Sequence, residues 1–433
     1  MHPNLSFDQA PPIGVPLRFL LTAPWFGVAA GLLLAWSGEV AVLSRWTPQA
    51  LALTHLLVAG FLLQAMTGAL FQFVPVAAGG NVWRPRLAAA IIHPMYIAAT
   101  ALLVAGFLAA NGSLLRLAAG LFLPTVLLHV ALVGSALLRT PARGATIAAL
   151  RVAVAGLAVT VVLGASLAEG IAGSHAWPLV QVTNVHAAWG LGGWALMLVL
   201  GVSYFVVPMF QLTPQYPAAF ARWAPIVLVG VLLAWSTQLL DAGADWLPLV
   251  WLAGLGVAAV FAGVTLWLQA RRRRRIADPT FHFFRGAMIC LLAAFASAAA
   301  MVLVPALGDE PAAAWWLGAL VIAGTFVSLI NGMMYKIVPF LCWLHLQRQA
   351  GIGGTVPNMR EIAPERAQRL QLRLHFASVT LLLLATFYAE VLVAAGAAFA
   401  ASCAWLGWNL IDAVRRYQGF RNRAGAGAAG REP

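Results

Sequence analysis

Three segments of one pattern decide the fold of this chain: GALFQFVP at residues 68–75, GVSYFVVP at 201–208 and GMMYKIVP at 332–339. All three read G-x-x-[FY]-x-[FIV]-V-P, and each lies near the end of a long apolar stretch. Their prolines, Pro75, Pro208 and Pro339, are almost evenly spaced, and each interval holds four apolar stretches long enough to span a membrane. A repeat at a fixed period is the sequence signature of an architecture built from equivalent units.

An arginine near the start of each unit follows nearly the same period. Arg18, Arg151 and Arg285 precede the motif proline of their units by the same interval in the first two units and by a slightly shorter one in the third. Two features in phase predict three four-helix repeats. The expected units span about 14–138, 146–269 and 282–414 within a single transmembrane domain that covers residues 1–433.

The motif has a physical interpretation. A proline near the end of a span stops or bends the helix, and a glycine two turns earlier lets a neighbouring helix approach closely. The aromatic residue between them suits the membrane interface. We therefore expect the three motif helices to line the centre of the molecule, with the other nine helices around them.

The composition requires a membrane. Of the 433 residues, 62% are hydrophobic and 9% are charged, whereas a soluble domain carries roughly 25% charged residues. The net charge of +13 comes almost entirely from arginine in short loops, a pattern typical of membrane topology rather than of nucleic-acid binding. The three cysteines form no CxxC pair, so neither a disulfide framework nor a zinc cluster is expected.

The predicted fold is an all-α integral membrane protein of about twelve transmembrane helices in three four-helix pseudo-repeats. A helix needs about 20 apolar residues to cross a bilayer. The predicted spans are 14–37, 48–76, 86–110, 112–138, 146–169, 181–210, 218–240, 245–269, 282–307, 312–343, 371–391 and 393–414. The longest connection, 344–370, and the C-terminal tail, 415–433, are polar and charged.

Charges alternate between successive loops. One set of loops is rich in arginine, including the run Arg271–Arg275, and the other holds mainly acids such as Glu169 and Asp241. The positive-inside rule places the arginine-rich set, with the 344–370 loop and the tail, in the cytoplasm. Both termini then lie inside, which requires an even number of spans. The expected location is a bacterial-type inner (plasma) membrane.

Two histidines are the leading candidates for a functional site, because ionisable side chains within a membrane are costly. His55 and His186 lie on the first and second motif helices, at nearly the same distance before the motif proline, in the outer half of the membrane. Imidazole ligates haem iron and copper, so we predict that this pair binds a cofactor or metal. The alternative is a buried histidine bonded to a neighbouring carbonyl.

Five residues are weaker candidates. Met66 and Met197 follow the leading histidines by eleven residues on roughly the same helix face. Thioether sulfur suits cuprous copper, but methionine usually fills a core. His93 and His129 both fall in the cytoplasmic half, where they could face one another as a second site or proton path, or simply pack. His175, in an outer loop, could approach the leading pair.

Side chains at the cytoplasmic ends of spans are expected to reach headgroups or water. His282, His345 and His375 have that position, and Lys336 is expected to snorkel rather than to carry protons. Asn331, on the third motif helix, is a candidate for an interhelical hydrogen bond.

Twelve spans, internal termini and three four-helix repeats together resemble subunit I of the heme-copper oxidase superfamily. The similarity is most specific in VHAAWGLGGWALMLVLGVSYFVVP, residues 185–208, which looks like the corresponding helix of C-type oxidases and nitric oxide reductases. The resemblance implies that His186 takes the place of a copper ligand. In THLLVAGFLLQAMTGALFQFVP, residues 54–75, it implies that His55 takes the place of a low-spin haem ligand.

Departures from that family limit what the resemblance implies. The family's tenth helix supplies two haem-ligating histidines, and the matching positions here hold Leu317 and Ala319. The seventh span, 218–240, has none of the histidines that bind copper in the family. A conventional terminal oxidase is therefore not expected. In span number and character the chain is similar to the NnrS family, haem- and copper-containing membrane proteins linked to nitric oxide metabolism.

Three functions remain open. The first is a haem-binding protein with a b-type haem on His55, His186 or both, and with copper at His186 as a variant. One ligand would leave the iron open to a diatomic molecule such as nitric oxide, and two would give a low-spin electron carrier for a respiratory redox partner. The second is a permease for a small solute or metal ion, suggested by polar residues on the motif helices. The third is a non-catalytic assembly or sensing partner of a respiratory complex.

Overall fold

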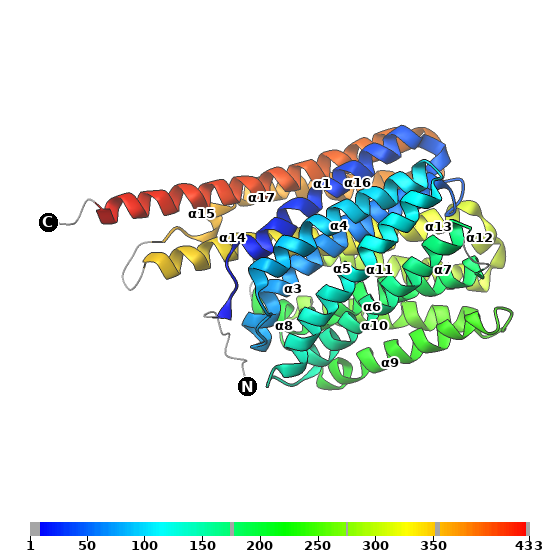
Figure 1. Cartoon of the computed structure of the whole chain (residues 1–433), viewed down its shortest axis with the longest axis horizontal. Helices are drawn as coiled ribbons and strands as arrows, with labels where there is room; N and C mark the ends of the chain where they lie inside the picture. The colour runs from blue at the N-terminus through cyan, green and yellow to red at the C-terminus, as the bar shows by residue number, and fades with distance from the viewer. Residues whose placement is uncertain (1–8, 174–176, 274–275, 351–355, 430–433) are drawn as a thin grey trace.

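Every regular element of the described chain is a helix. The computed structural model describes residues 9–173, 177–273, 276–350 and 356–429. Its long helices lie roughly along one common axis and form a single bundle (Figure 1). Eleven helices within these ranges are long and apolar enough to cross a membrane. The all-α, multi-pass membrane architecture is thus confirmed.

Eight of the eleven spans are built on a single α-helix. They are α1 (Gly14–Ser37), α4 (Pro85–Leu108), α5 (Gly112–Arg139), α6 (Ala145–Ile171), α9 (Ala218–Ser236), α10 (Leu247–Ala270), α11 (Pro279–Leu303) and α17 (Leu392–Ala429). Short elements connect or extend them: η2 (Gly38–Ala41), η5 (Thr237–Leu239), α12 (Pro305–Asp309), α15 (Met359–Ile362) and η7 (Ala389–Val391).

The three motif helices share a construction that the sequence did not predict. Each consists of an α-helix, a π-helical segment and a second α-helix. The three are α2 (Pro48–His55), η3 (Leu56–Leu62) and α3 (Leu63–Ala78); α7 (Leu179–Ala188), η4 (Trp189–Leu196) and α8 (Met197–Gln211); α13 (Pro311–Gly318), η6 (Ala319–Val327) and α14 (Ser328–Ala350). All three π segments end at nearly the same distance before the motif proline. Wide π turns inside helices often mark functional sites.

The motif helices occupy the centre of the bundle. Their most apolar windows are 78%, 72% and 61% buried, against at most 50% for any other candidate span. A cavity of about 160 Å³ lies among them. Leu70 of α3, Val202 of α8 and Met333 of α14 all line it, so the three helices face one another across a common axis.

Each motif glycine packs against the first helix of its own unit. A Cβ atom on Gly68 would lie 2.9 Å from the carbonyl oxygen of Pro16 and 2.9 Å from Phe19 Cβ in α1. In the other two units, the added atom would again meet a side-chain Cβ within 2.9 Å, and a backbone carbonyl three residues earlier at 3.3 Å. These contacts are Gly201 with Thr146 and Ala149, and Gly332 with Thr280 and Phe283. The motif glycine therefore permits a close helix approach, as expected.

In all three units the motif glycine meets an equivalent position of the first helix. The unit arginines do not all stand at equivalent positions relative to this contact. Arg151 and Arg285 each stand two residues after the Cβ-contacting residue of their unit, whereas Arg18 stands one residue before it. The arginine of the first unit is therefore displaced by three residues, close to one helical turn.

The predicted span 371–391 is not among the eleven. Its sequence forms α16 (Glu365–Leu384), which begins six residues earlier and ends seven residues earlier than expected. Arg366, Arg369 and Arg373 occupy the first half of this helix and lower its mean hydropathy. Nevertheless, the indole of Trp315 in α13 donates to Leu382 and that of Trp405 in α17 donates to Ala367, so α16 packs within the bundle along most of its length.

Two helices continue past their predicted ends. α14 extends to Ala350 and α17 to Ala429, so parts of the expected polar loop 344–370 and tail 415–433 are helical. No glycine or proline interrupts residues 340–350. In α17, Arg416 pairs with Asp412 one turn earlier at 2.7 Å. Such pairs stabilise a helix in water, beyond the apolar segment.

Gly68→Ala is expected to destabilise the protein by about 1–3 kcal/mol, because the added methyl group overlaps the backbone of α1. Thermal unfolding of the detergent-purified protein measures the loss as a lower Tm. Gly230→Ala is the matched control, since an added Cβ on that face of α9 meets no atom within 4 Å. Equal melting temperatures for the two variants would contradict the packed register.

Candidate functional site

The two leading histidines meet between the first and second motif helices. His55 is the last residue of α2 and directly precedes the π segment η3. His186 lies in the last turn of α7, just before η4. Their ring centroids are 6.4 Å apart and the ring planes differ by 21°. Two side chains from different motif helices thus form one pair.

Both imidazoles have the same tautomer. His55 Nδ1 lies 2.7 Å from the carbonyl oxygen of Leu51, and His186 Nδ1 lies 3.0 Å from that of Thr160 in α6. A carbonyl oxygen only accepts hydrogen bonds, so each Nδ1 carries the proton and donates it. The lone pair is then on Nε2 in both rings. Metal-ligating histidines almost always donate their other ring N–H to a carbonyl or carboxylate in this way.

Neighbouring helices fix the two rings in place. The ring of Phe107, near the end of α4, lies 5.1 Å from that of His55. Gly164 of α6 faces His186, and a Cβ atom there would lie 3.0 Å from its Cε1. Glycine at this position therefore leaves the room that the His186 ring occupies. Neither ring can turn freely, since each is held by a backbone hydrogen bond on one side and by packing on another.

The ring separation suits two axial ligands of one metal ion. With metal–nitrogen bonds of about 2 Å and roughly 1.2 Å from ring centre to nitrogen, two imidazoles on opposite sides of an ion have centroids about 6.4 Å apart. The observed distance is 6.4 Å. The pair therefore has the spacing for a shared ion.

The pair supplies two imidazole side chains from different helices. No group of three or more His, Cys, Asp or Glu side chains able to hold a metal occurs among the described residues. Structural and catalytic sites for bare zinc, and typical copper sites, take at least three protein ligands. Haem iron has four porphyrin nitrogens and needs only one or two axial ligands from the protein. His175 lies outside the described residues, within 174–176.

A polar network borders the pair on the side of the loop that joins η2 to α2. Arg45, between η2 and α2, donates from Nη1 to Asn184 Oδ1 at 2.9 Å, and Asn184 Nδ2 donates to Gln238 Oε1 at 3.1 Å. Asn184 stands two residues before His186 on α7. Partial burial lowers the pKa of the Arg45 guanidinium, which nevertheless keeps its charge at neutral pH. A cation thus lies close to the N-terminal ends of the histidine-bearing helices α2 and α7.

The methionines do not join the histidine pair. Met66 and Met197 are eleven residues further along their helices, which is roughly 16 Å at the rise of an α-helix. Met66 lines the central cavity, and Met197 is fully buried in the core. Both therefore act as packing residues in this structure.

His93 and His129 do not face one another either. His93 Nε2 lies 2.9 Å from the hydroxyl of Thr22 in α1. His129 turns instead toward Tyr96, whose hydroxyl is 2.9 Å from its Nδ1. The two residues therefore have different hydrogen-bond partners, although the rings of Phe19 and Phe71 lie between them.

The remaining histidines have contrasting environments. His282 is exposed and His345 is half-buried, with its Nδ1 2.7 Å from the Tyr417 hydroxyl. His375, expected at a solvated helix end, is instead fully buried, and its Nε2 is 2.7 Å from Ser328 Oγ of α14. The reason is that α16 begins earlier than predicted, which places His375 halfway along the helix. Asn331 is also fully buried, but its side chain makes no hydrogen bond within the described ranges.

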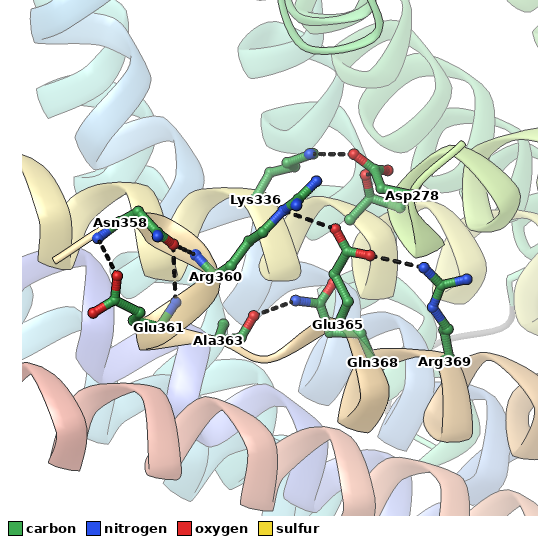
Figure 2. Close-up of polar contacts among 10 residues, drawn as sticks. Asp278, Lys336, Asn358, Arg360, Glu361, Ala363, Glu365, Gln368 and Arg369 are labelled. Atoms are coloured by element: carbon green, nitrogen blue, oxygen red, sulfur yellow. Dashed lines mark hydrogen bonds and ion pairs between the residues drawn. The ribbon is translucent and has the colours of Figure 1, made fainter. Parts of the chain in front are cut away.

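Lys336 has an ion-pair partner that the sequence did not indicate. Its Nζ lies 2.7 Å from Asp278 Oδ2 at the start of α11, as Figure 2 shows, so it does not simply snorkel. Burial alone would raise the pKa of Asp278. The Lys336 charge, with hydrogen bonds from Lys336, Thr280 and the Phe281 N–H, holds that pKa below its ordinary value of 3.8. In the same view, Glu365 at the start of α16 pairs with Arg360 and Arg369.

The sequence was compared with protein families and with curated proteins. No protein-family model and no curated protein matches this sequence. The resemblance carried by the His55 and His186 segments therefore stays a prediction, and the chemistry of the site follows from its geometry. Two features of that geometry had no clear sequence signal: the π segments beside the histidines, and the Arg45–Asn184 contact between distant parts of the chain.

Lys336→Met is expected to lower stability at pH 7 by about 1–3 kcal/mol, because it removes the 2.7 Å ion pair that Lys336 makes with the largely buried Asp278 carboxylate. Asp278 has a depressed folded-state pKa, so the pair contributes fully above about pH 4 and its contribution is lost as the pH falls through that folded value. Thermal unfolding from pH 7 downward tests this. The difference in Tm between Lys336→Met and the wild type should shrink in acid. A difference that stays constant with pH would show that the charge pair is not responsible.

Proposed function

We propose that this protein is an integral membrane haem protein in which His55 and His186 bind the iron of one b-type haem from opposite sides. The main support is the 6.4 Å separation of two imidazoles whose Nδ1 atoms both donate to backbone carbonyls. Both Nε2 lone pairs are therefore available, and the spacing suits two ligands on one ion.

Other residues of the chain have roles in holding such a group. Arg45 would pair with a haem carboxylate at the outer surface, since it is the cation nearest along the chain to the histidine-bearing helices. Phe107 would pack beside the porphyrin, and Gly164 keeps space beside His186. Haem bound in this way supplies one-electron redox chemistry.

Two protein ligands favour electron transfer over binding of a diatomic molecule. An iron with both axial positions taken has no open site for nitric oxide, and it changes little in structure on reduction. We therefore propose an electron carrier in respiratory or nitric oxide metabolism. The sequence resemblance to heme-copper oxidases supports haem binding by His55, while the pairing with His186 replaces the copper role that the resemblance implied.

The central cavity does not favour a permease for ions or polar solutes. Gln72 and Ser203 are the only polar side chains among the described residues that line its roughly 160 Å³. A polar substrate there would lose its hydration without gaining comparable hydrogen bonds.

Haem binding is tested by purifying the protein after haem-sufficient expression and recording its absorption spectrum. We expect a Soret band and about one b-type haem per chain, with loss of most haem in His55→Ala and in His186→Ala. His282→Ala, at an exposed position, should retain the wild-type spectrum. Wild-type protein that folds but contains no haem iron would overturn the proposed function.

We also propose that α16 is a twelfth span, as in the oxidase-like fold. The described ends of the chain, at the start of α1 and the end of α17, emerge at the same end of the bundle (Figure 1). Ends on one side require an even number of crossings, which the eleven apolar helices alone do not give. With α16 the number is twelve, and the arginine-rich side is the cytoplasm by the positive-inside rule.

Cysteine labelling tests this topology. In a chain with its three native cysteines replaced by alanine, an impermeant maleimide added to intact cells is expected to label Tyr388→Cys and to spare Met359→Cys. These exposed positions flank α16 on either side. Labelling of both, or of neither until the membrane is permeabilised, would place the two loops on one side and contradict a twelfth crossing.

A further inference from the structure

A second polar site lies deeper in the membrane domain, around His129 of α5. This residue is 1% exposed. Its Nδ1 is 2.9 Å from the Tyr96 hydroxyl of α4 and 3.5 Å from Thr67 Oγ1 of α3. The ring stacks on Phe71, and the Trp194 ring of η4 meets it at an angle of 88° with centroids 6.4 Å apart. Four different segments of the bundle therefore meet at one imidazole.

Five buried polar atoms on the helical segments that meet at His129 find no hydrogen-bond partner in the described part of the chain. They are Nε2 of His129, both amide atoms of Gln64, the hydroxyl of Thr100 and the indole nitrogen of Trp194. None of these residues is more than 4% exposed. Buried polar groups are almost always hydrogen bonded, either to protein or to ordered water, and an unsatisfied one is costly.

Helix geometry brings these groups to one side of His129. Gln64 precedes Thr67 by about one turn on α3, and Thr100 follows Tyr96 by about one turn on α4. Successive helices joined by a short loop run in opposite directions, so both positions lie outward of His129. That is the direction of the His55–His186 pair, which is carried on the first two motif helices.

The hydrogen-bonding capacity of these four side chains indicates what kind of ligand they would bind. An indole only donates, an amide and a hydroxyl both donate and accept, and Nε2 of His129 needs one partner of either kind. No charged side chain belongs to the set, so an ion would be uncompensated. A small neutral molecule that donates and accepts at once fits all four side chains.

We propose that Gln64, Thr100, His129 and Trp194 form a binding site for buried water molecules within the membrane domain, inward of the His55–His186 pair. Internal waters typically make about three hydrogen bonds to groups of this kind. Water at this site would give Nε2 of His129 a partner for proton exchange, in addition to the Tyr96 hydroxyl at Nδ1.

Hydroxyl-radical footprinting by X-ray irradiation, read by mass spectrometry, tests the site in the wild-type protein. Radicals form from water itself, so a buried side chain beside bound water is oxidised. We expect Trp194 to be oxidised faster than Trp189, which is on the same helix, is less buried and has its indole N–H bonded to Ser236. Slower oxidation of Trp194 than of Trp189 would overturn the proposal.

Variants assign the effect to this site. Gln64→Leu combined with Thr100→Val removes two of the polar groups and should reduce oxidation of Trp194 to the level of Trp189 or below. His375→Leu, which removes a buried histidine of the third unit, should leave Trp194 oxidation as in wild type. Unchanged oxidation in the double variant would contradict the assignment. The readout does not involve haem, so it is independent of the spectroscopic test of the His55–His186 pair.

Discussion

The contact of each motif glycine with the backbone of the first helix in its unit is the constraint on which the site depends. Lipid gives apolar helices no hydrophobic reason to associate, so close packing through small residues is decisive. Gly68, Gly201 and Gly332 each meet an equivalent carbonyl oxygen and Cβ atom. These contacts fix the height of the central helices relative to the bundle, and with it the depth of every side chain they carry.

The π segments bring the two histidines together although they stand at different distances from their motif glycines. His186 stands two residues further from its motif glycine than His55 does, so strict α-helical geometry would not give them equal height and direction. The intervening π segments have 7 and 8 residues, and wider turns change both rise and rotational phase. The rings meet at 6.4 Å despite the difference of two residues. Backbone carbonyls of Leu51 and Thr160 then set the tautomer of the two rings. Helix packing thus determines both where the imidazoles lie and which of their nitrogens carries the proton.

The membrane-spanning helices could be predicted from the sequence, because helix length and hydropathy are strong local signals. Eleven predicted spans match the apolar helices within a few residues at most ends, because length and hydropathy dominate in a membrane. The matched positions of His55 and His186 along their helices followed from counting back from the proline of the repeated motif. Neither their approach nor their tautomer could be predicted, since both depend on helix rotation and, for His186, on a carbonyl that a different helix, α6, supplies.

The predictions for His375, Lys336 and the two methionines were wrong because they too depend on contacts between helices. His375 is buried because α16 begins at Glu365, where the Arg360 and Arg369 pairs hold a charged first turn; hydropathy alone started that helix too late. Lys336 pairs with Asp278 from a different helix of the same unit, a contact that no local pattern reveals. The methionines matched the histidines in helical face but not in height, and a ligand set needs both.

Electron paramagnetic resonance of the oxidised, purified protein tests the central claim most directly, because the spin state of ferric haem reports its axial ligands. Two imidazoles on one iron predict a low-spin signal in wild type, and His55→Ala and His186→Ala should each abolish it through a high-spin signal or loss of haem. A high-spin wild-type signal, or a low-spin signal that persists in either variant, would contradict the pairing of His55 with His186.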